Sequence, residues 1–286
     1  MLKIALPNKG RLAEEVRELF ADAGLEVRAR SDRALTASLG GEFEGLFVRA
    51  QDIPEFVADG AADAGVTGMD LVLESGRPLA TLLDLEFGVC RLVLAARDES
   101  GIRKPEDVPA GARVATCFPK LTADYFAKRG QQVTVVPVSG AAEIAPHLGI
   151  ADVVVDLTST GSTLKVNGLR EVATVVESSA RLVTASGRAQ GKDAAALGEL
   201  VAALASVLRA RGKRYVMTNV PRDALPRVRE VLPGLNGPTV IDVLNGGKMV
   251  AVHAVVESVG IYRTIANLKA LGCEGILVTR IERLMP

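Results

Sequence analysis

Aromatic side chains are scarce in this sequence, which has no tryptophan and only three tyrosines and seven phenylalanines among 286 residues. Proteins that bind single-stranded nucleic acids usually stack the bases on aromatic rings, so this composition argues against that class. An excess of charge of one sign is also lacking, because 34 lysines and arginines balance 34 aspartates and glutamates. A neutral chain has no overall electrostatic footprint for a nucleic-acid backbone, and we expect no nucleic-acid partner.

Cysteine is scarce too, and Cys90, Cys117 and Cys273 lie far apart in the chain. An odd number of cysteines without a C-x-x-C pair argues against a disulfide framework or a zinc site and suits a reducing compartment. The two histidines, His147 and His253, have no cysteine or carboxylate beside them at metal-ligand spacing, and we interpret both as structural. We therefore expect no metal site built from protein ligands alone.

Long apolar runs are missing, and no stretch approaches the length of a transmembrane helix. The longest candidate, Leu197–Leu208, is interrupted and is bounded by charged residues. The opening residues MLKIALP are too few, and are broken too soon by Pro7, to form a signal peptide. We expect a cytoplasmic protein without a membrane partner.

Short strand-like apolar runs alternate with helical patterns along most of the chain, which predicts an α/β architecture of two or three domains. The pattern restarts near residue 110, and Gly60–Val66 resembles Gly149–Val155, each following an expected helix and entering an expected strand. The repeat indicates two similar lobes with the ligand site between them, although a generic helix-to-strand turn explains it equally well. The expected strands are 3–6, 43–49, 64–67, 91–96, 113–116, 133–138, 152–157, 172–176 and 181–184, and the expected helices are 11–23, 53–59, 69–74, 121–128, 141–148 and 193–211.

The pattern changes after Gly212. Strands and helices then follow the order βαββαβ, which is the ferredoxin-like order. Asn245-Gly246-Gly247 is a strong signal for the hairpin turn between the second and third of these strands. We expect a separate C-terminal domain with a regulatory or oligomeric role.

The segment most informative about chemistry is Thr158–Thr163, in which five of six residues carry a hydroxyl and the sixth is Gly161. It follows an expected apolar strand, and amide groups and hydroxyls in such a turn form a concave anion site. The Gly-Lys-Ser/Thr of a nucleotide triphosphate P-loop is missing, so the segment is not a P-loop. It predicts a phosphate site, against the plainer alternative of a loop rich in helix-capping residues. Asp156, at the end of the strand, is placed to accept hydrogen bonds from ribose hydroxyls or to act as a turn residue.

Two cations, Lys9 and Arg11, flank Gly10 where the first expected strand gives way to the first expected helix. Cations at a helix N-terminus oppose the helix dipole, which suggests that an anionic ligand such as a pyrophosphate or triphosphate offsets the cost. The alternative is a pair of solvated surface side chains. Arg49 and Asp70 also follow expected strands, where ligands bind in open α/β sheets, although each alone is more often a turn or surface residue.

These motifs together resemble the ATP phosphoribosyltransferase family, which catalyses the first step of histidine biosynthesis. The family signature is a Glu, five residues, a Gly, then a strand ending in Asp and a T-G-x-T-L loop. The opening segment Pro7–Leu12 and the segment Gly65–Asp70 also match the family, and the C-terminal βαββαβ unit resembles the regulatory domain of its long form. The signature is matched here at Glu143, Gly149, Ala151, Val154, Asp156, Thr160, Gly161, Thr163 and Leu164.

The resemblance implies a two-lobed catalytic core of the periplasmic-binding-protein type (type II), followed by a ferredoxin-like domain. The domain boundaries expected on this basis are 1–98 and 176–211 for the first catalytic lobe, 99–175 for the second lobe, and 212–286 for the C-terminal regulatory domain.

The resemblance also implies the ligands and their sites. Mg²⁺ is expected to be held mainly by substrate oxygens, and the protein is expected to form a dimer or hexamer that histidine inhibits. The implied catalytic residues are Lys9, Arg11, Glu143 and Asp156. Phosphoribosyl pyrophosphate is expected at Asp156, Thr158, Ser159, Thr160, Gly161, Ser162 and Thr163, ATP at Arg11, Arg49, Asp70 and Leu71, and histidine near Thr239, His253 and Ala254.

Two other functions remain open from the sequence. A two-lobed sensor would bind a small molecule without turning it over. A transferase with a different acceptor would use the same sugar donor, and competition between acceptors would distinguish it.

Overall fold

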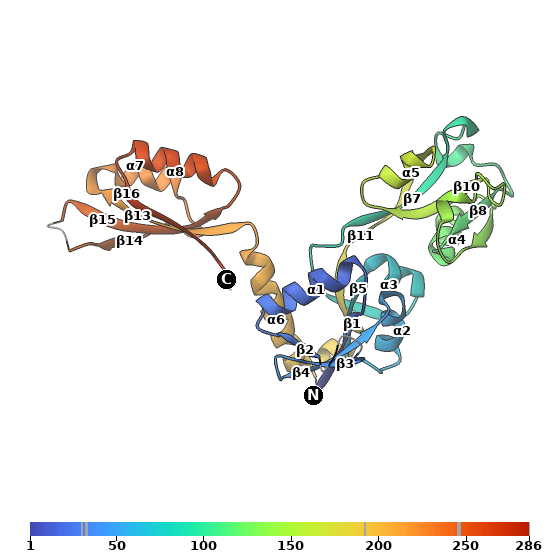
Figure 1. Cartoon of the computed structure of the whole chain (residues 1–286), viewed down its shortest axis with the longest axis horizontal. Coiled ribbons are helices and arrows are strands. Elements are labelled where there is room, and N and C mark those ends of the chain that lie inside the picture. The colour runs from blue at the N-terminus through green and yellow to red at the C-terminus, as the bar shows by residue number, and fades with distance from the viewer. Residues whose placement is uncertain (30, 32–33, 192, 245–246, 286) are drawn as a thin grey trace. The chain divides into compact units, whose positions relative to one another are not determined.

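The computed structural model describes the chain except residues 30, 32–33, 192, 245–246 and 286, and except the side chains of residues 11 and 189 (Figure 1). The described residues form two compact units, Met1–Val201 and Ala202–Pro286. Helix α6 (Ala194–Ala210) runs across the boundary between the units.

The first unit contains two sheets, and the first of them has seven strands in the order β2-β3-β4-β1-β5-β12-β6. Strand β1 is parallel to both β4 and β5, whereas β12 is antiparallel to β5 and β6. The helices α1 (Arg11–Asp22), α2 (Ile53–Ala58) and α3 (Met69–Ser75) pack against it. The strands are β1 Leu2–Pro7, β2 Val27–Ala29, β3 Thr36–Leu39, β4 Phe43–Val48, β5 Ala64–Gly68, β6 Leu79–Asp84 and β12 Ala180–Ala185.

The second sheet has five strands in the order β11-β7-β10-β8-β9. Strands β10, β8 and β9 are parallel neighbours, and β7 lies antiparallel between β10 and β11. The helices α4 (Pro119–Ala127) and α5 (Ser162–Val166) belong to this lobe. Its strands are β7 Cys90–Arg97, β8 Arg113–Thr116, β9 Thr134–Pro137, β10 Val153–Thr158 and β11 Leu169–Ser178, and its short 3₁₀ helices are η2 Asp98–Ser100, η3 Pro105–Asp107 and η4 Ala142–Ile144.

The division between the lobes differs from the expected one. Strands β7 and β11 both belong to the second sheet, so the chain leaves the first sheet after β6 and returns to it at β12. The sequence placed these changes at residue 98 and residue 176. A buried apolar run such as Cys90–Arg97 has the same pattern in either sheet, and only its antiparallel pairing with β10 and β11 decides the assignment.

The helix predicted over 141–148 is also wrong for most of its length, because the structure has only η4 there. Ala141 takes a positive φ of 51° just before it, and Pro146 interrupts the pattern two residues after it. Both features are incompatible with a continuous α-helix. The segment is therefore a compact turn that carries Glu143 beside β10, with which η4 is in contact.

The second unit confirms the βαββαβ order. Its sheet has the order β14-β15-β13-β16, and α7 and α8 lie over one face of it (Figure 1). The core on that face contains Val216, Val252 and Leu268. The predicted hairpin turn at Asn245-Gly246-Gly247 includes two positions outside the described residues. The elements are β13 Lys213–Pro221, η6 Arg222–Ala224, α7 Leu225–Val231, β14 Thr239–Asp242, β15 Met249–Glu257, α8 Ile261–Ala270 and β16 Glu274–Arg280.

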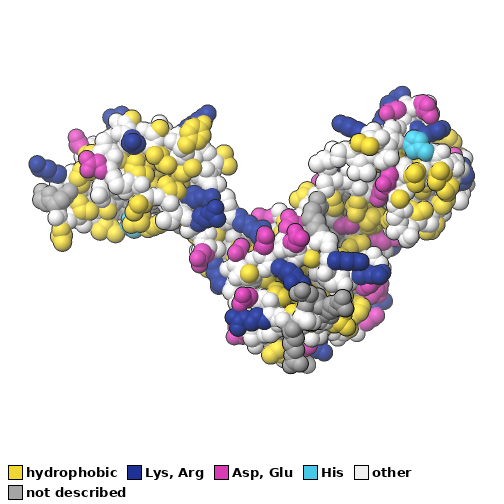
Figure 2. Space-filling view, viewed as in Figure 1, with side chains coloured by type: hydrophobic (Ala, Val, Ile, Leu, Met, Phe, Trp, Pro, Cys, Tyr) yellow, Lys and Arg dark blue, Asp and Glu magenta, His cyan; other side chains and the backbone are white. Residues whose placement is uncertain are grey.

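Two α/β lobes followed by a ferredoxin-like domain are the fold class that the sequence predicts, and the structure confirms it. On the face drawn in Figure 2, basic and acidic side chains are interspersed, in keeping with the balanced composition. Among the described residues, no helix is both long and apolar enough to span a bilayer.

Candidate functional site

The hydroxyl-rich loop forms a tight turn between β10 and α5. The amide of Gly161 donates to Thr158 Oγ1 at 2.8 Å, and the Thr160 and Ser162 hydroxyls are 2.9 Å apart. Gly161 has a φ of 76°, a left-handed conformation that a side chain disfavours. Thr160, Ser162 and Thr163 are exposed, whereas Thr158 is buried. The loop therefore presents its hydroxyls to solvent around a fixed glycine.

The backbone amides at the end of the loop are available to donate hydrogen bonds to an anion. The Ser162 amide makes only a long bond of 3.4 Å to Thr160 Oγ1, which a phosphate oxygen can replace. The first amides of any helix have no partner within the helix, and those of Ser162 and Thr163 open α5. Together with the hydroxyls of the four exposed residues Ser159, Thr160, Ser162 and Thr163, they provide donors suited to an anion.

Two carboxyl groups meet beside this loop. Asp156 of β10 is half-buried, and burial raises its pKa above the ordinary value for Asp. The amide of Leu157, which donates to Asp156 Oδ1 at 2.8 Å, opposes that shift, and the neighbouring Glu143 adds to it. Glu143 comes from η4, so the structure brings together two residues that the sequence placed on separate elements. A close pair of carboxylates suits hydroxyl donors or a cation.

Cys117 is a third member of this group and was not among the predicted site residues. Burial raises the pKa of its thiol, and the charges of Asp156 and Glu143 raise it further. The signal in the sequence was positional, because Cys117 directly follows β8, whose end lies beside β10. Among the described residues, no group of three or more His, Cys, Asp and Glu side chains is arranged to hold a metal ion.

The cationic segment lies at the carboxyl end of the inner strands β1 and β4 of the first sheet. Lys9 is exposed and follows β1, and Arg49 is exposed and follows the parallel neighbour β4. The amide of Asn8 donates to Val48 O at 2.8 Å, which ties the two strand ends together. Arg11 opens α1, but its side chain lies outside the described part of the structure. The structure therefore places Lys9 and Arg49 at the shared carboxyl end of two parallel strands.

The buried Asp70 is held by hydrogen bonds within the protein. It is only 4% exposed, and its Oδ1 accepts a hydrogen bond of 2.5 Å from Ser178 Oγ, to which the Asp70 amide also donates at 3.0 Å. A Cβ on Gly68 would lie 2.2 Å from the same carboxylate oxygen, so any larger residue there would displace the Asp70 carboxylate. Leu71 is half-buried and packs against the core of the second lobe. Both residues join the lobes, and their contact with a nucleotide stays a prediction.

In the second unit, Thr239 and His253 form a cross-strand pair between β14 and β15. Tyr215 of β13, which the sequence did not single out, hydrogen-bonds through its hydroxyl to His253 Nδ1. Ala254 lies on the opposite, helix-covered face because successive strand residues alternate. The structure therefore groups two of the three predicted effector residues and separates the third.

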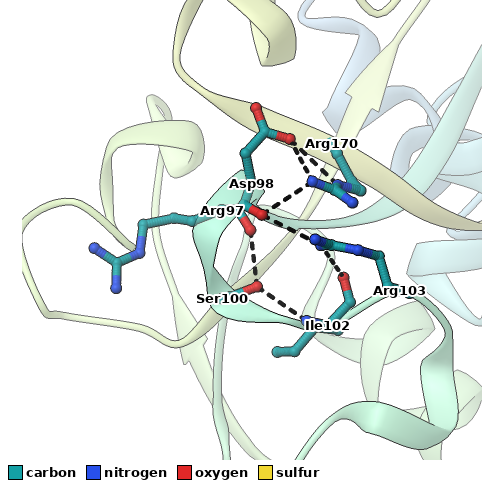
Figure 3. Close-up of polar contacts among 6 residues, drawn as sticks. All are labelled: Arg97, Asp98, Ser100, Ile102, Arg103 and Arg170. Atoms are coloured by element: carbon teal, nitrogen blue, oxygen red, sulfur yellow. Dashed lines mark hydrogen bonds and ion pairs between the residues drawn. The ribbon is translucent and has the colours of Figure 1, made fainter.

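A pocket of about 440 Å³ adjoins the hydroxyl loop. Two of its lining residues, Asp98 and Arg170, belong to the cluster drawn in Figure 3, in which Arg170 and Arg103 converge on Asp98. Arg170 Nη2 donates to Asp98 Oδ1 at 2.8 Å, and Arg103 Nη1 donates to the Asp98 carbonyl at 3.2 Å. These contacts fix the turn after β7 against β11. The pocket is lined by Asp98, Thr160, Gly161, Leu164, Lys165, Leu169, Arg170 and Glu171.

Comparison with known families gives two matches that together span most of the chain. Residues 49–206 match the model described as "ATP phosphoribosyltransferase" (HisG), which includes the loop, Asp156 and Glu143. Residues 210–283 match "HisG, C-terminal domain", which corresponds to the βαββαβ unit.

Individual relatives agree with the family models. The ATP phosphoribosyltransferase of Gemmatimonas aurantiaca is 68% identical over the full length of both chains, and that of Natronomonas pharaonis is 50% identical, again over the full length of both. The solved "ATP phosphoribosyl transferase (HisG:HisZ) complex from Thermotoga maritima" is similar with a TM-score of 0.62 and 30% identity. That similarity covers 72% of this chain and 99% of the other.

Proposed function

The chain belongs to the ATP phosphoribosyltransferase family, and from that membership we propose that its loop Thr158–Thr163 holds the 5-phosphate of phosphoribosyl pyrophosphate. The reaction of the family transfers the phosphoribosyl group to N1 of ATP with release of pyrophosphate, the first step of histidine biosynthesis. The observation that carries the proposal is the turn between β10 and α5, where exposed hydroxyls and helix-opening amides surround Gly161 beside Asp156 and Glu143.

The chemistry requires no nucleophile from the protein. The adenine N1 forms a bond to ribose carbon 1 while the bond from that carbon to pyrophosphate breaks, so the transition state resembles an oxocarbenium ion. The enzyme then contributes by holding two anionic substrates in line and by neutralising charge on the leaving group. In this scheme the hydroxyl loop anchors the end of the donor that does not react.

Asp156 and Glu143 are assigned to the ribose hydroxyls in this proposal. Their position directly before and beside the loop supports it, because the 5-phosphate and the ribose hydroxyls belong to one sugar. A carboxylate that accepts hydrogen bonds from the two hydroxyls fixes the orientation of carbon 1. The charges of both carboxyl groups raise the pKa of the Cys117 thiol, and we assign Cys117 to the same subsite.

We assign the phosphates of the leaving group or of ATP to Lys9 and Arg11. The exposed Lys9 at the end of β1 supports this, since a cation there is poorly placed against the dipole of α1 unless an anion binds. Arg49, at the end of the neighbouring strand, is assigned to ATP together with Asp70 and Leu71. For the last two, contacts through the α3 backbone fit better than direct side-chain contacts, because both side chains are engaged between the lobes.

We propose that Mg²⁺ enters with the substrates. The carboxylates of Asp156 and Glu143 are oxygen donors that suit this ion, and Mg²⁺ usually takes one or two carboxylates together with phosphate oxygens and water. When bound, the ion neutralises negative charge on the pyrophosphate group.

We further propose that the second unit is a regulatory domain for histidine in a homo-oligomer, a dimer or hexamer, located in the cytoplasm. The match of residues 210–283 to the HisG C-terminal domain supports the regulatory role. The complex named for the Thermotoga maritima relative supports assembly with further subunits, although that name gives two different proteins, HisG and HisZ. Within the domain, Thr239, His253 and Tyr215 form the polar group on the face of the sheet opposite α7 and α8.

The loop assignment is tested by steady-state kinetics of Thr160→Val. Losing a hydrogen bond to a phosphate is expected to raise KM for phosphoribosyl pyrophosphate by roughly tenfold or more and to leave KM for ATP nearly unchanged. Thr134→Val is the matched control, because Thr134 is an exposed threonine on β9 of the same sheet. An unchanged KM for the donor in Thr160→Val would remove the loop from the donor site.

A further inference from the structure

Arg91 and Glu171 form a two-pronged ion pair between neighbouring strands of the second sheet. Arg91 Nη1 donates to Glu171 Oε2 at 2.8 Å, and Nη2 donates to Oε1 at 3.1 Å. Both side chains are about one-third exposed, at 34% and 32%. Such a parallel geometry is stronger and more directional than a single contact. The pair is therefore a fixed feature of the sheet surface.

The pair lies directly against the hydroxyl loop. A Cβ added to Gly161 would lie 2.8 Å from Glu171 Oε1, so the carboxylate packs on the α-carbon of this residue. Arg91 is also the backbone partner of Thr158, where the loop begins. One residue of the pair thus contacts the turn of the loop, and the other contacts its origin.

This placement creates an electrostatic problem for an anion-binding loop. A carboxylate behind Gly161 repels a phosphate bound in front of it, and the repulsion acts at short range across partly desolvated protein. The guanidinium of Arg91 cancels most of that charge. The guanidinium is charged at any physiological pH, and the carboxylates of Glu171 and Glu177 raise the pKa of Arg91 further.

We propose that Arg91 and Glu171 are positioning residues for the phosphoribosyl donor: Glu171 fixes the path of the loop at Gly161, and Arg91 cancels the negative charge that Glu171 places behind the bound phosphate. The inference rests on the assignment of the donor phosphate to Thr158–Thr163. Neither side chain is assigned a contact with the reacting atoms.

The test is a set of variants measured by calorimetric binding of phosphoribosyl pyrophosphate and by steady-state kinetics. Arg91→Gln leaves the Glu171 carboxylate uncancelled, and we expect the donor Kd to rise about tenfold with KM for ATP nearly unchanged. Arg91→Lys keeps the charge and loses the two-pronged geometry, and it is expected to stay within about threefold of the unaltered protein. The Arg91→Gln/Glu171→Gln double variant removes both charges and is expected to recover most of the affinity.

Recovery in the double variant separates charge cancellation from simple structural support. If the pair only held the strands together, the double variant would bind the donor as weakly as Arg91→Gln or more weakly, and this result would overturn the proposal. Arg113→Gln is the matched control, because Arg113 pairs with Asp152 at the opposite end of β10. Its donor affinity is expected to be unchanged.

Thr160→Val distinguishes failure of this inference from failure of the loop assignment. If Thr160→Val weakens donor binding and Arg91→Gln does not, the loop assignment stands and the role of the pair is wrong. If neither variant changes donor binding, the loop is not the phosphate site and both proposals fall. Thermal unfolding of every variant identifies any that fails to fold. If the double variant fails to fold, Arg91→Lys decides: a donor affinity within about threefold of the unaltered protein supports charge cancellation, and a larger loss overturns it.

Discussion

Asp156 is a half-buried carboxyl whose pKa is raised, mainly by burial and in addition by Glu143. The raised value means that the folded protein favours the protonated form more than the unfolded chain does. As far as this group is concerned, the free energy of unfolding is therefore highest below the ordinary pKa of Asp. It falls as the pH rises through the raised pKa of the folded protein. At neutral pH the ionised Asp156 lowers the free energy of unfolding, although the proposed chemistry requires the carboxylate.

Asp156→Asn is accordingly expected to raise the melting temperature at neutral pH and to lower kcat/KM by about tenfold or more, because the charged acceptor for the ribose hydroxyls is lost. Thermal melts across the acid range test the physical cause. The gain in stability should shrink as the pH falls through the raised pKa and should be smallest below the ordinary pKa of Asp. A variant that is less stable than the parent by the same amount at every pH would show that Asp156 supports the fold instead.

Some site residues could be predicted from the sequence and others could not. The run Thr158–Thr163 and Asp156 were visible because an unusual composition followed an apolar strand. Arg91, Glu171 and Ser178 were not visible, since each is an ordinary polar residue on a strand and gains its role from a partner far away in the chain. The side-chain partner of Asp70, for example, is 108 residues away.

Helix α3 is held at both ends by hydrogen bonds to its side chains, which shows how one short element joins the two lobes. At its start, the Asp70 carboxylate accepts from Ser178 at the end of β11. Near its end, the two carboxylate oxygens of Glu74 accept the amides of Lys120 and Leu121 at 2.8 and 2.9 Å. These amides belong to the first turn of α4, so Glu74 acts as an N-cap supplied by another helix.

We expect Glu74→Ala to lower the free energy of unfolding by about 1–2 kcal/mol, because it leaves two helix-opening amides without their acceptor and removes a favourable charge at the helix N-terminus. A loss of this size corresponds to a fall in melting temperature of roughly 2–8 °C for a unit of this length. Glu18→Ala, an exposed position in α1, is the control and should change little. Equal melting temperatures for the parent and Glu74→Ala would show that the contact contributes nothing to the joining of the lobes.

Elements were predicted best where their burial is uniform. Strands β5 and β10 are apolar runs buried along most of their length, and both were found. The short strands β2 and β3, of three and four residues, were missed because their pattern is too brief to stand out from a loop. Burial alone also could not assign β7 to a sheet, because long-range pairing makes that choice.

At the scale of the whole chain, catalysis and regulation are assigned to different units, Met1–Val201 and Ala202–Pro286. The proposed effector group of Thr239, His253 and Tyr215 lies entirely within the second unit. A change there should therefore alter inhibition without altering the uninhibited reaction.

For His253→Ala we expect the concentration of L-histidine that gives half-inhibition to rise about tenfold or more, with kcat and both KM values in the absence of histidine within about twofold of the parent. Initial rates over a series of histidine concentrations provide the measurement. Unaltered inhibition in this variant would place the effector elsewhere, and a parent enzyme insensitive to histidine would remove the regulatory assignment altogether.

The C-terminal βαββαβ order was predictable from the sequence because the periodicity changes after Gly212 and the order is complete after it. The second compact unit begins earlier than expected, at Ala202 within α6. The boundary between the two lobes was not predictable, since the chain crosses between the sheets at β6–β7 and β11–β12, where no change in composition marks the crossing.

The central claim is that this chain joins a phosphoribosyl group to ATP at the site built around Thr158–Thr163. The most direct test is release of pyrophosphate by the purified protein supplied with ATP, phosphoribosyl pyrophosphate and Mg²⁺, with a pyrophosphatase added to draw the reaction forward and the nucleotide product identified by mass. We predict release only when both substrates are present, with two phosphates formed through the pyrophosphatase for each phosphoribosyl-ATP, and with Thr160→Val requiring a higher concentration of the donor. Binding of the donor without release of pyrophosphate, or release that does not depend on ATP, would contradict the account.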